Sequence, residues 1–205
     1  LSEAPKIHRL PEYSAGTWWV QDAAASLPVM VMGDIKGKKV IDLCAAPGGK
    51  TAQLINKGAI VTSLDCSEER LSTLRKNMSR LKFFPSDIIC EDIIAYLKHF
   101  SAEPFDAVLL DAPCSATGVF RRPPELVYLK TAKDIAKQAA FQKEILSLIS
   151  PTLKTGGELI YCTCSIAKAE GEHQINNFVR QFPNFKIRQA PSVPQSRCCC
   201  SRRRA

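Results

Sequence analysis

Short apolar runs alternate along the chain with longer amphipathic stretches, and this alternation predicts the secondary structure. The runs are apolar on both faces, which is typical of buried parallel strands. Helix signals lie between them, such as Ser67 in a capping position with Glu68 and Glu69 behind it. The predicted strands cover residues 39–43, 59–64, 87–90, 105–110, 158–161 and 185–188, and the predicted helices cover 21–32, a stretch ending near 57, 68–82, 93–100, 131–148 and 170–182.

Strands alternate with helices throughout, which indicates an α/β fold with a doubly wound, mostly parallel, Rossmann-like sheet. The 205 residues suffice for one such domain and are too few for two. Residues 1–20 hold two tryptophans and little periodicity, so we expect an irregular N-terminal segment. The domain itself is predicted over residues 21–190, and residues 191–205 form a basic, cysteine-rich tail that we expect to be disordered.

The net charge of +8 is concentrated at one end of the chain. Four arginines in the last nine residues account for half of it, so the body of the chain gives only a weak indication of a polyanionic partner. No apolar run is long enough to span a membrane, and no charged-then-apolar leader is present. We therefore expect a cytoplasmic protein without a membrane partner. Leu1 in place of methionine indicates a piece of a longer protein.

The nine cysteines are odd in number, several adjoin apolar runs, and none forms a Cys-x-x-Cys pair. This pattern argues against a disulfide framework and against a zinc site. We expect free thiols in a reducing compartment, and no metal.

Acids and thiols stand at or just beyond the predicted strand ends. Because neighbouring parallel strands end on the same side of a sheet, these side chains should share one ligand site. Each aspartate taken alone could instead be a helix cap or a turn residue. The residues in question are Asp42, Asp65, Asp92, Asp111, Cys114, Cys162 and Cys164.

The segment 44–51 after the first strand is a loop of small residues. Gly48 and Gly49 would let a ligand approach the backbone, although a tight strand-to-helix turn explains them equally well. Asp65 at the next strand end could accept hydrogen bonds from ribose hydroxyls, and Asp92 could contact an adenine amino group. The glycine spacing that binds a pyrophosphate is missing, so S-adenosylmethionine fits better than NAD.

Two thiols at neighbouring strand ends suit methylation of a pyrimidine at carbon 5. A thiolate that adds at carbon 6 makes carbon 5 nucleophilic, and a base then removes the carbon-5 proton so that the thiol can leave. Asp111 could hydrogen-bond the cytosine ring edge during the addition. Cys114 and Cys164 lie just past strand ends and are the candidates, whereas Cys162 lies within a strand and is interpreted as structural.

Three segments together resemble the signature motifs of the Sun/NOL1/NOP2 family of RNA cytosine-5 methyltransferases, most closely its bacterial Sun (Fmu) type. They are residues 42–51, residues 111–118 and Thr163-Cys164-Ser165, and residues 20–25 resemble a segment that precedes the fold in that family. The likeness covers roughly residues 11–182.

The resemblance implies an S-adenosylmethionine-dependent RNA (cytosine-5-)-methyltransferase that acts on 16S ribosomal RNA as a monomer. It makes Cys164 the nucleophile and Cys114 the residue that assists product release. The residues alone leave the reverse assignment open, since Pro113-Cys114 resembles the Pro-Cys nucleophile of DNA cytosine methyltransferases. Transfer RNA as substrate, a DNA methyltransferase and an inactive RNA-binding fragment are the alternatives. The implied cofactor contacts are Cys44, Ala45, Ala46, Pro47, Gly48, Gly49, Lys50, Asp65, Asp92 and Asp111, and the catalytic set is Cys164, Cys114 and Asp111.

The chain departs from the family pattern at both ends. An N-terminal RNA-binding domain related to the NusB fold is not matched, and residues 191–205 replace the expected last strand, so the sheet should lack that strand. The tail is either an RNA-binding arm or a truncated or out-of-frame end. Arg121 and Arg122 follow the Cys114 loop and are predicted RNA contacts, with a solvated charge pair as the alternative.

Overall fold

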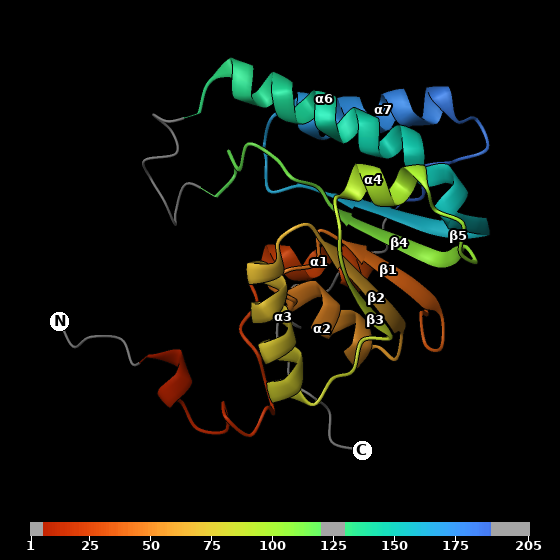
Figure 1. Cartoon of the computed structure of the whole chain (residues 1–205). Coiled ribbons are helices and arrows are strands. Elements are labelled where there is room, and N and C mark those ends of the chain that lie inside the picture. Colours follow the sequence, from red (N-terminus) through yellow and green to blue (C-terminus); the bar gives the residue numbers. More distant parts are fainter. Residues whose placement is uncertain (1–5, 120–129, 190–205) are drawn as a thin grey trace.

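The computed structural model describes residues 6–119 and 130–189, and a parallel sheet of five strands lies at its centre (Figure 1). The strands lie in the order β3-β2-β1-β4-β5, and all neighbours are parallel. This arrangement confirms the predicted doubly wound α/β fold. The strands are β1 (Lys39–Leu43), β2 (Ile60–Asp65), β3 (Asp87–Cys90), β4 (Phe105–Asp111) and β5 (Leu153–Cys162).

Helices cover the two faces of the sheet in separate layers (Figure 1). One layer holds α1 (Ala23–Val31), α2 (Gly49–Asn56) and α3 (Glu68–Leu81). The other holds α4 (Ile93–Lys98), α6 (Ala132–Ile149) and α7 (Glu172–Gln181). Short 3-10 helices are η1 (Ile7–Arg9), η2 (Ser150–Thr152) and η3 (Lys168–Glu170).

Local sequence signals fix where several helices begin. The Ser67 hydroxyl accepts the Arg70 N–H at the start of α3, as predicted. At the start of α6, Thr131 and Asp134 form a reciprocal capping box. Apolar positions three and four residues apart then turn one face of each helix toward the sheet, so the helices both start and dock where the sequence pattern indicates.

The central strands β1 and β4 are buried on both faces. Val40, Leu43, Val108 and Leu109 are each 0 % exposed. Their side chains pack into a core under α4, α6 and α7 and a second core under α1 and α2. Dense packing on both sides holds these strands rigidly, and with them the loops that begin at their carboxyl ends.

The predicted strand over residues 185–188 is wrong, because the structure assigns no strand to residues 182–189. Phe185 packs instead on α7, with ring centroids 4.9 Å from Phe178 and 6.3 Å from Phe182. An apolar, aromatic pattern suits a strand and an aromatic cluster equally, and packing decided between them.

Strand β5 starts earlier than predicted, at Leu153. Gly156 and Gly157 therefore lie inside the strand, where the register with β4 is irregular between Phe105 and Ala107. Gly156 has φ +79°, which is typical of a glycine in a β-bulge.

The N-terminal segment is irregular apart from η1, as predicted, and it packs against the end of α3 (Figure 1). The Arg80 guanidinium lies 3.9 Å from the Tyr13 ring centroid and donates to the carbonyls of Tyr13 and Trp18. Within residues 6–119 and 130–189, no helix combines the length and apolar character needed to cross a bilayer. The predicted tail over residues 191–205 lies outside the described residues.

Candidate active site

The predicted strand-end residues meet at one edge of the sheet. Asp111 ends β4, Cys162 ends β5, and the two are paired in the register of these strands. Asp65 ends β2, and the loop after β1 begins at Cys44. The strand order reverses between β1 and β4, which is the point where doubly wound sheets bind their ligands.

Two thiols lie together beyond this edge, each on its own loop. The Sγ atoms of Cys114 and Cys164 are 3.2 Å apart. The Gly118 N–H donates to the Cys164 carbonyl over 2.9 Å and ties the two loops together. A Cβ on Gly118 would lie 2.6 Å from that carbonyl oxygen, so the close approach requires glycine. The pairing of thiols expected from the sequence is therefore present.

The two sulfurs differ in their readiness to ionise. A hydrogen bond from the Cys164 thiol lowers the pKa of Cys114 to about 6, and the same bond raises the pKa of Cys164. The Thr163 side chain and the backbone amide of Ala116 add further donors to Cys114. At neutral pH the pair therefore carries one thiolate, on Cys114, and one thiol, on Cys164.

Lys50, in the first turn of α2, forms an ion pair with Asp111 at the end of β4. Its ammonium nitrogen is 2.6 Å from Oδ2 of Asp111. Burial opposes the charge of Lys50, but Asp111 outweighs that effect and the pKa of Lys50 lies above its ordinary value. The sequence did not reveal this pair, because Lys50 and Asp111 are 61 positions apart and meet only across β1 and β4.

The other carboxylate oxygen of Asp111 accepts the thiol of Cys162 over 3.5 Å. Burial raises the pKa of Cys162, so this third sulfur stays protonated. Its place in the strand agrees with the structural role expected for it.

The loop between β1 and α2 is held tightly from within. The Ala45 N–H donates to the Leu64 carbonyl over 3.0 Å, and the Gly48 N–H donates to the Ala45 carbonyl over 2.9 Å. Cys44 and Gly48 both have positive φ, +64° and +102°. A non-glycine residue in that region is a local strain of the kind that gathers at functional sites. The structure therefore shows the tight strand-to-helix turn, and the approach of a ligand to this backbone stays a prediction.

Asp65 fixes this loop to the end of β2. Its Oδ2 accepts the Ala46 N–H over 3.2 Å, and its Oδ1 accepts the Ser67 N–H over 3.1 Å. The Arg70 guanidinium lies 3.2 Å from the same Oδ2 and donates to the Ala46 carbonyl over 2.6 Å. Asp65 is 2 % exposed. Its ribose contact stays a prediction, and a ribose reaches these oxygens only if Arg70 moves.

The two remaining aspartates have structural partners. Asp92 caps α4, its Oδ1 accepting the Ala95 N–H over 3.0 Å, and its adenine contact stays a prediction. Asp42 lies one residue before the end of β1, as predicted, and is 1 % exposed. The Thr51 hydroxyl donates to its Oδ2 over 2.7 Å, whereas Oδ1 has no partner. Burial raises the pKa of Asp42 to about 7.

One buried acid behind the thiols was missed by the sequence interpretation, which placed Glu170 at the start of a helix. Glu170 lies in η3 and is 0 % exposed. Its carboxylate accepts hydrogen bonds from Ser115 and Ser165, the residues that follow the two cysteines. No local pattern distinguishes this acid from the many that open helices, so only the tertiary contacts identify it.

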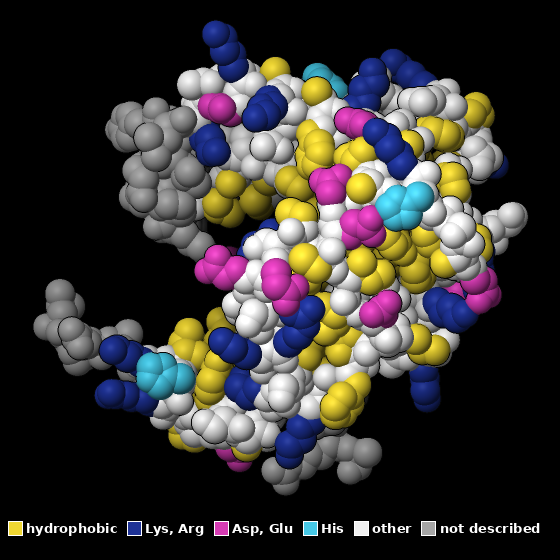
Figure 2. Space-filling model, viewed as in Figure 1, with side chains coloured by type: hydrophobic (Ala, Val, Ile, Leu, Met, Phe, Trp, Pro, Cys, Tyr) yellow, Lys and Arg dark blue, Asp and Glu magenta, His cyan; other side chains and the backbone are white. Residues whose placement is uncertain are grey.

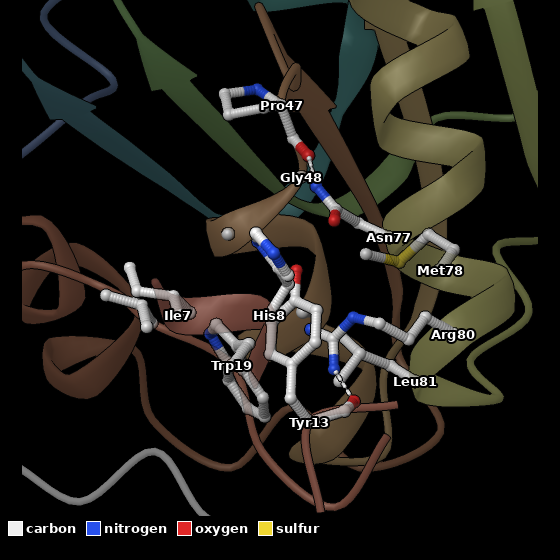
Figure 3. A pocket seen from close by; sticks show the side chains of 13 residues that line it. Ile7, His8, Tyr13, Trp19, Pro47, Gly48, Asn77, Met78, Arg80 and Leu81 are labelled. Carbon is white, nitrogen blue, oxygen red and sulfur yellow. Dashed lines mark hydrogen bonds between the residues drawn. The ribbon is translucent and has the colours of Figure 1, made fainter. Parts of the chain in front are cut away.

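A cavity of about 300 Å³ lies on the outer side of the loop over residues 44–51, between the N-terminal segment and α3 (Figure 3). His8, Tyr13, Trp19, Gly48 and Arg80 are among the residues that line it. Asn77 closes it on one side by donating to the Pro47 carbonyl over 3.0 Å. Of the described residues that line the cavity, none is a cysteine or an aspartate, so it is separate from the thiol site.

Two further predictions concern RNA contacts and metal binding. Arg121 and Arg122 lie outside the described residues. In the described part of the chain, no group of three or more His, Cys, Asp or Glu side chains is arranged to hold a metal ion. The six cysteines described, Cys44, Cys66, Cys90, Cys114, Cys162 and Cys164, all have free thiols.

Comparison with known proteins agrees with this geometry. A family model described as 16S rRNA methyltransferase RsmB/F matches residues 29–200. Ribosomal RNA small subunit methyltransferase B of Vibrio cholerae is 42 % identical over 183 residues, 88 % of this chain and 42 % of that protein. The protein of the same name from Salmonella arizonae is 39 % identical over 197 residues, covering 95 % and 46 %. The chain thus spans less than half the length of these relatives.

Solved structures with the same fold include two at 30 % sequence identity. The crystal structure of NSun6 from Pyrococcus horikoshii with SFG has a TM-score of 0.78 and covers 87 % of this chain and 46 % of that one. The crystal structure of PH0851 has a TM-score of 0.84 and covers 94 % and 45 %.

Proposed function

Because the chain belongs to the 16S rRNA methyltransferase RsmB/F family, we propose that it transfers a methyl group from S-adenosylmethionine to carbon 5 of a cytosine in RNA. The observation that carries this proposal is the pair of sulfurs 3.2 Å apart beside Asp111 and Lys50. In this reaction a sulfur must first bond to carbon 6 and later leave it. Two thiols suit such a reaction, one to form the bond and one to assist the elimination.

The pair of thiols supports a division of roles. Cys164 attacks carbon 6 of the cytosine, and its proton passes to the Cys114 thiolate that already accepts its hydrogen bond. After methylation the proton on carbon 5 passes to Cys114, once that sulfur has released its first proton to solvent. The electron pair re-forms the double bond between carbons 5 and 6, and Cys164 leaves carbon 6 as a thiolate. Cys114, the sulfur next to that bond, assists this elimination. The roles given to the two cysteines by resemblance are thus compatible with their electrostatics.

Asp111 and Lys50 serve the substrate side. The carboxylate of Asp111 accepts a hydrogen bond from the cytosine ring edge, and the ion pair with Lys50 holds that carboxylate in place. Lys50 lies in the first turn of α2, and Asp111 ends β4. The pair therefore also connects the loop after β1 to the loop that carries Cys114.

The residues at the sheet edge fit S-adenosylmethionine. Ala45 and Ala46 leave little side-chain bulk on the loop after β1, Gly48 keeps its backbone approachable, and Asp65 and Asp92 offer acceptors at the next two strand ends. Cys44, Ala45, Ala46, Pro47, Gly48, Gly49, Lys50, Asp65, Asp92 and Asp111 are the proposed contacts. When bound, this cofactor supplies the methyl group.

The proposed substrate is 16S ribosomal RNA. Support comes from the names of the relatives, which are ribosomal RNA small subunit methyltransferases, at about 40 % identity. The proposal places the protein in the cytoplasm, acting as a monomer.

A transfer assay tests the proposal. The chain is incubated with methyl-labelled S-adenosylmethionine and, separately, with 16S ribosomal RNA, transfer RNA and DNA, and the product nucleosides are identified. We expect 5-methylcytosine in 16S ribosomal RNA, and none with Cys164→Ala. Label in transfer RNA alone, or in DNA alone, would mean that this nucleic acid is the substrate and 16S ribosomal RNA is not. Binding of S-adenosylmethionine without label in any of the three would make this chain an inactive RNA-binding fragment.

A further inference from the structure

The loops that carry the two thiols repeat one arrangement: each cysteine is followed by a serine, and both serines reach the same buried carboxylate. Ser115 follows Cys114 and Ser165 follows Cys164. The Ser115 hydroxyl donates to Oε2 of Glu170 over 2.5 Å, and the Ser165 hydroxyl donates to the same oxygen over 2.6 Å. The two loops are 50 residues apart in sequence and meet at this one acid.

The other oxygen of Glu170 is also fully engaged. Oε1 accepts the Ser115 N–H over 2.9 Å and the side-chain amide of Gln142 over 3.1 Å. The same amide donates to the Pro113 carbonyl over 2.8 Å, directly before Cys114. Four donors converge on four lone-pair positions, and only an ionised carboxylate offers that many.

The charge of Glu170 is maintained in spite of its burial. Burial opposes ionisation, but the hydrogen bonds from Ser115, Ser165 and Gln142 outweigh it, and the pKa of Glu170 lies below its ordinary value. A buried charge is costly unless it is fully hydrogen-bonded. Here every bond that compensates for the cost also fixes one of the two cysteine loops.

We propose that Glu170 is a positioning residue that holds the Cys114 and Cys164 thiols at hydrogen-bonding distance by fastening the serine behind each of them. The inference rests on the proposed function, to which it adds the residue that sets the separation of the two sulfurs. Glu170 acts through the loops and does not touch the reacting atoms.

The test uses the ionisation of the thiols, which requires neither RNA nor cofactor. The rate of alkylation of Cys114 and Cys164 by iodoacetamide is measured against pH, with peptide mass spectrometry separating them from the exposed thiols of Cys66 and Cys90. The variants are Glu170→Gln, Ser165→Ala and, as the matched control, Glu172→Gln. Glu172 is an exposed acid two residues further on, paired with Lys168.

Loosening the loops separates the sulfurs and removes the hydrogen bond that lowers the first thiol pKa. We expect the alkylation profile of Glu170→Gln to move up by about one pH unit, so that alkylation at pH 5, below the pKa, slows about tenfold. Ser165→Ala should move it in the same direction by less, and Glu172→Gln should leave it unchanged. The other titratable groups near the sulfurs, Asp111, Tyr161, Lys50 and Cys162, are retained in every variant.

A purely electrostatic role gives the opposite sign, because removing a negative charge lowers a nearby thiol pKa. A profile of folded Glu170→Gln that is unchanged or moves down therefore overturns the proposal. If Glu170→Gln does not fold, as judged by circular dichroism, Ser165→Ala decides by the same criterion. A chain that methylates no RNA but shows the upward shift contradicts the proposed function and leaves the positioning role standing.

Discussion

Two sulfur atoms at hydrogen-bonding distance divide one proton between them, and this decides what each cysteine can do. Cys114 ionises first because the Cys164 thiol donates to it. In the proposed mechanism, a thiolate that accepts a hydrogen bond from Cys164 lies beside the thiol that must lose its proton. Cys114 therefore suits the proton-handling role, and Cys164 suits the covalent one.

The covalent step should distinguish the two cysteines. Cys164→Ala should form no adduct with RNA, because nothing adds at carbon 6. Cys114→Ala should still add, more slowly because the base for the Cys164 proton is gone, and should release more slowly still, so a protein–RNA adduct should accumulate. Denaturing electrophoresis after incubation with substrate RNA and S-adenosylmethionine measures both. An adduct in Cys164→Ala and none in Cys114→Ala would reverse the assignment.

Asp65 should contribute to cofactor affinity. Asp65→Ala leaves ribose hydroxyls without an acceptor, which should weaken binding of S-adenosylmethionine by roughly 1–3 kcal/mol. Titration calorimetry measures the change. Asp87→Ala serves as the control, since Asp87 is an exposed acid at the opposite end of β3. Equal affinities in the two variants would remove Asp65 from the cofactor site.

Asp42 should make stability depend on pH. In the unfolded chain it ionises near pH ~4, whereas burial raises its pKa in the folded chain to about 7. The folded state thus keeps a proton that the unfolded state has lost, so the stabilisation is complete below the unfolded pKa and is lost as pH rises through 7.

Urea unfolding of Asp42→Asn tests this. The free energy of unfolding of the parent, minus that of Asp42→Asn, should fall between pH 4 and pH 8, by about 1.4 kcal/mol for each unit of pKa shift. Asp34→Asn is the control, because Asp34 is exposed and caps only the Lys36 N–H. A difference that stays constant with pH contradicts the shift.

At the scale of the elements, the loop after β1 depends on how closely it lies against α3. Gly48 has φ +102°, and a Cβ there would meet Leu74 at 3.1 Å and Met78 at 3.2 Å. Gly37 also has positive φ, +73°, but nothing lies within 4 Å of its Cβ position. A substitution at Gly37 therefore reports backbone strain alone, whereas a substitution at Gly48 reports backbone strain together with crowding against α3.

Gly48→Ala should destabilise the chain more than Gly37→Ala. The backbone penalty common to both is about 1–2 kcal/mol, and crowding against α3 should add about 1–3 kcal/mol for Gly48→Ala alone. Urea denaturation of both variants gives the comparison. Equal losses would mean that α3 yields to the added methyl group and does not hold the loop.

On the scale of the whole molecule, the described basic side chains on the face seen in Figure 2 do not gather in a single patch. Lysine and arginine side chains are spread over both helical layers on the face seen in Figure 2. Much of the net charge of +8 belongs to residues 197–205, and Arg121 and Arg122 also lie outside the described residues. The described basic side chains on this face therefore single out no RNA-binding surface.

Arg121 and Arg122 should contribute to RNA binding through phosphate contacts. Their double replacement by alanine should weaken binding and make the dependence of affinity on salt shallower, by up to about two counterions. Fluorescence anisotropy over a range of salt concentrations measures the slope. Lys133→Ala/Lys137→Ala on the exposed surface of α6 is the control. Identical slopes in both variants would make the arginines a solvated charge pair.

The sequence by itself determined which segments form strands and helices, and which reactive side chains stand at the strand ends. Apolar runs identified all five strands, and the cap at Ser67 marked where a helix begins, because these signals act within one turn or one strand. The pairing of Cys114 with Cys164 also followed from local information, since parallel strands end on one side.

Only the tertiary structure decided which side chains meet across the sheet. Residues 185–188 have a strand-like pattern but pack as part of an aromatic cluster on α7. Lys50 pairs with Asp111 over 61 positions, and Glu170 joins two loops 50 positions apart. Local periodicity carries no information about such distant partners. Their selection depends on burial, where an unpaired charge is costly and a matching donor becomes decisive.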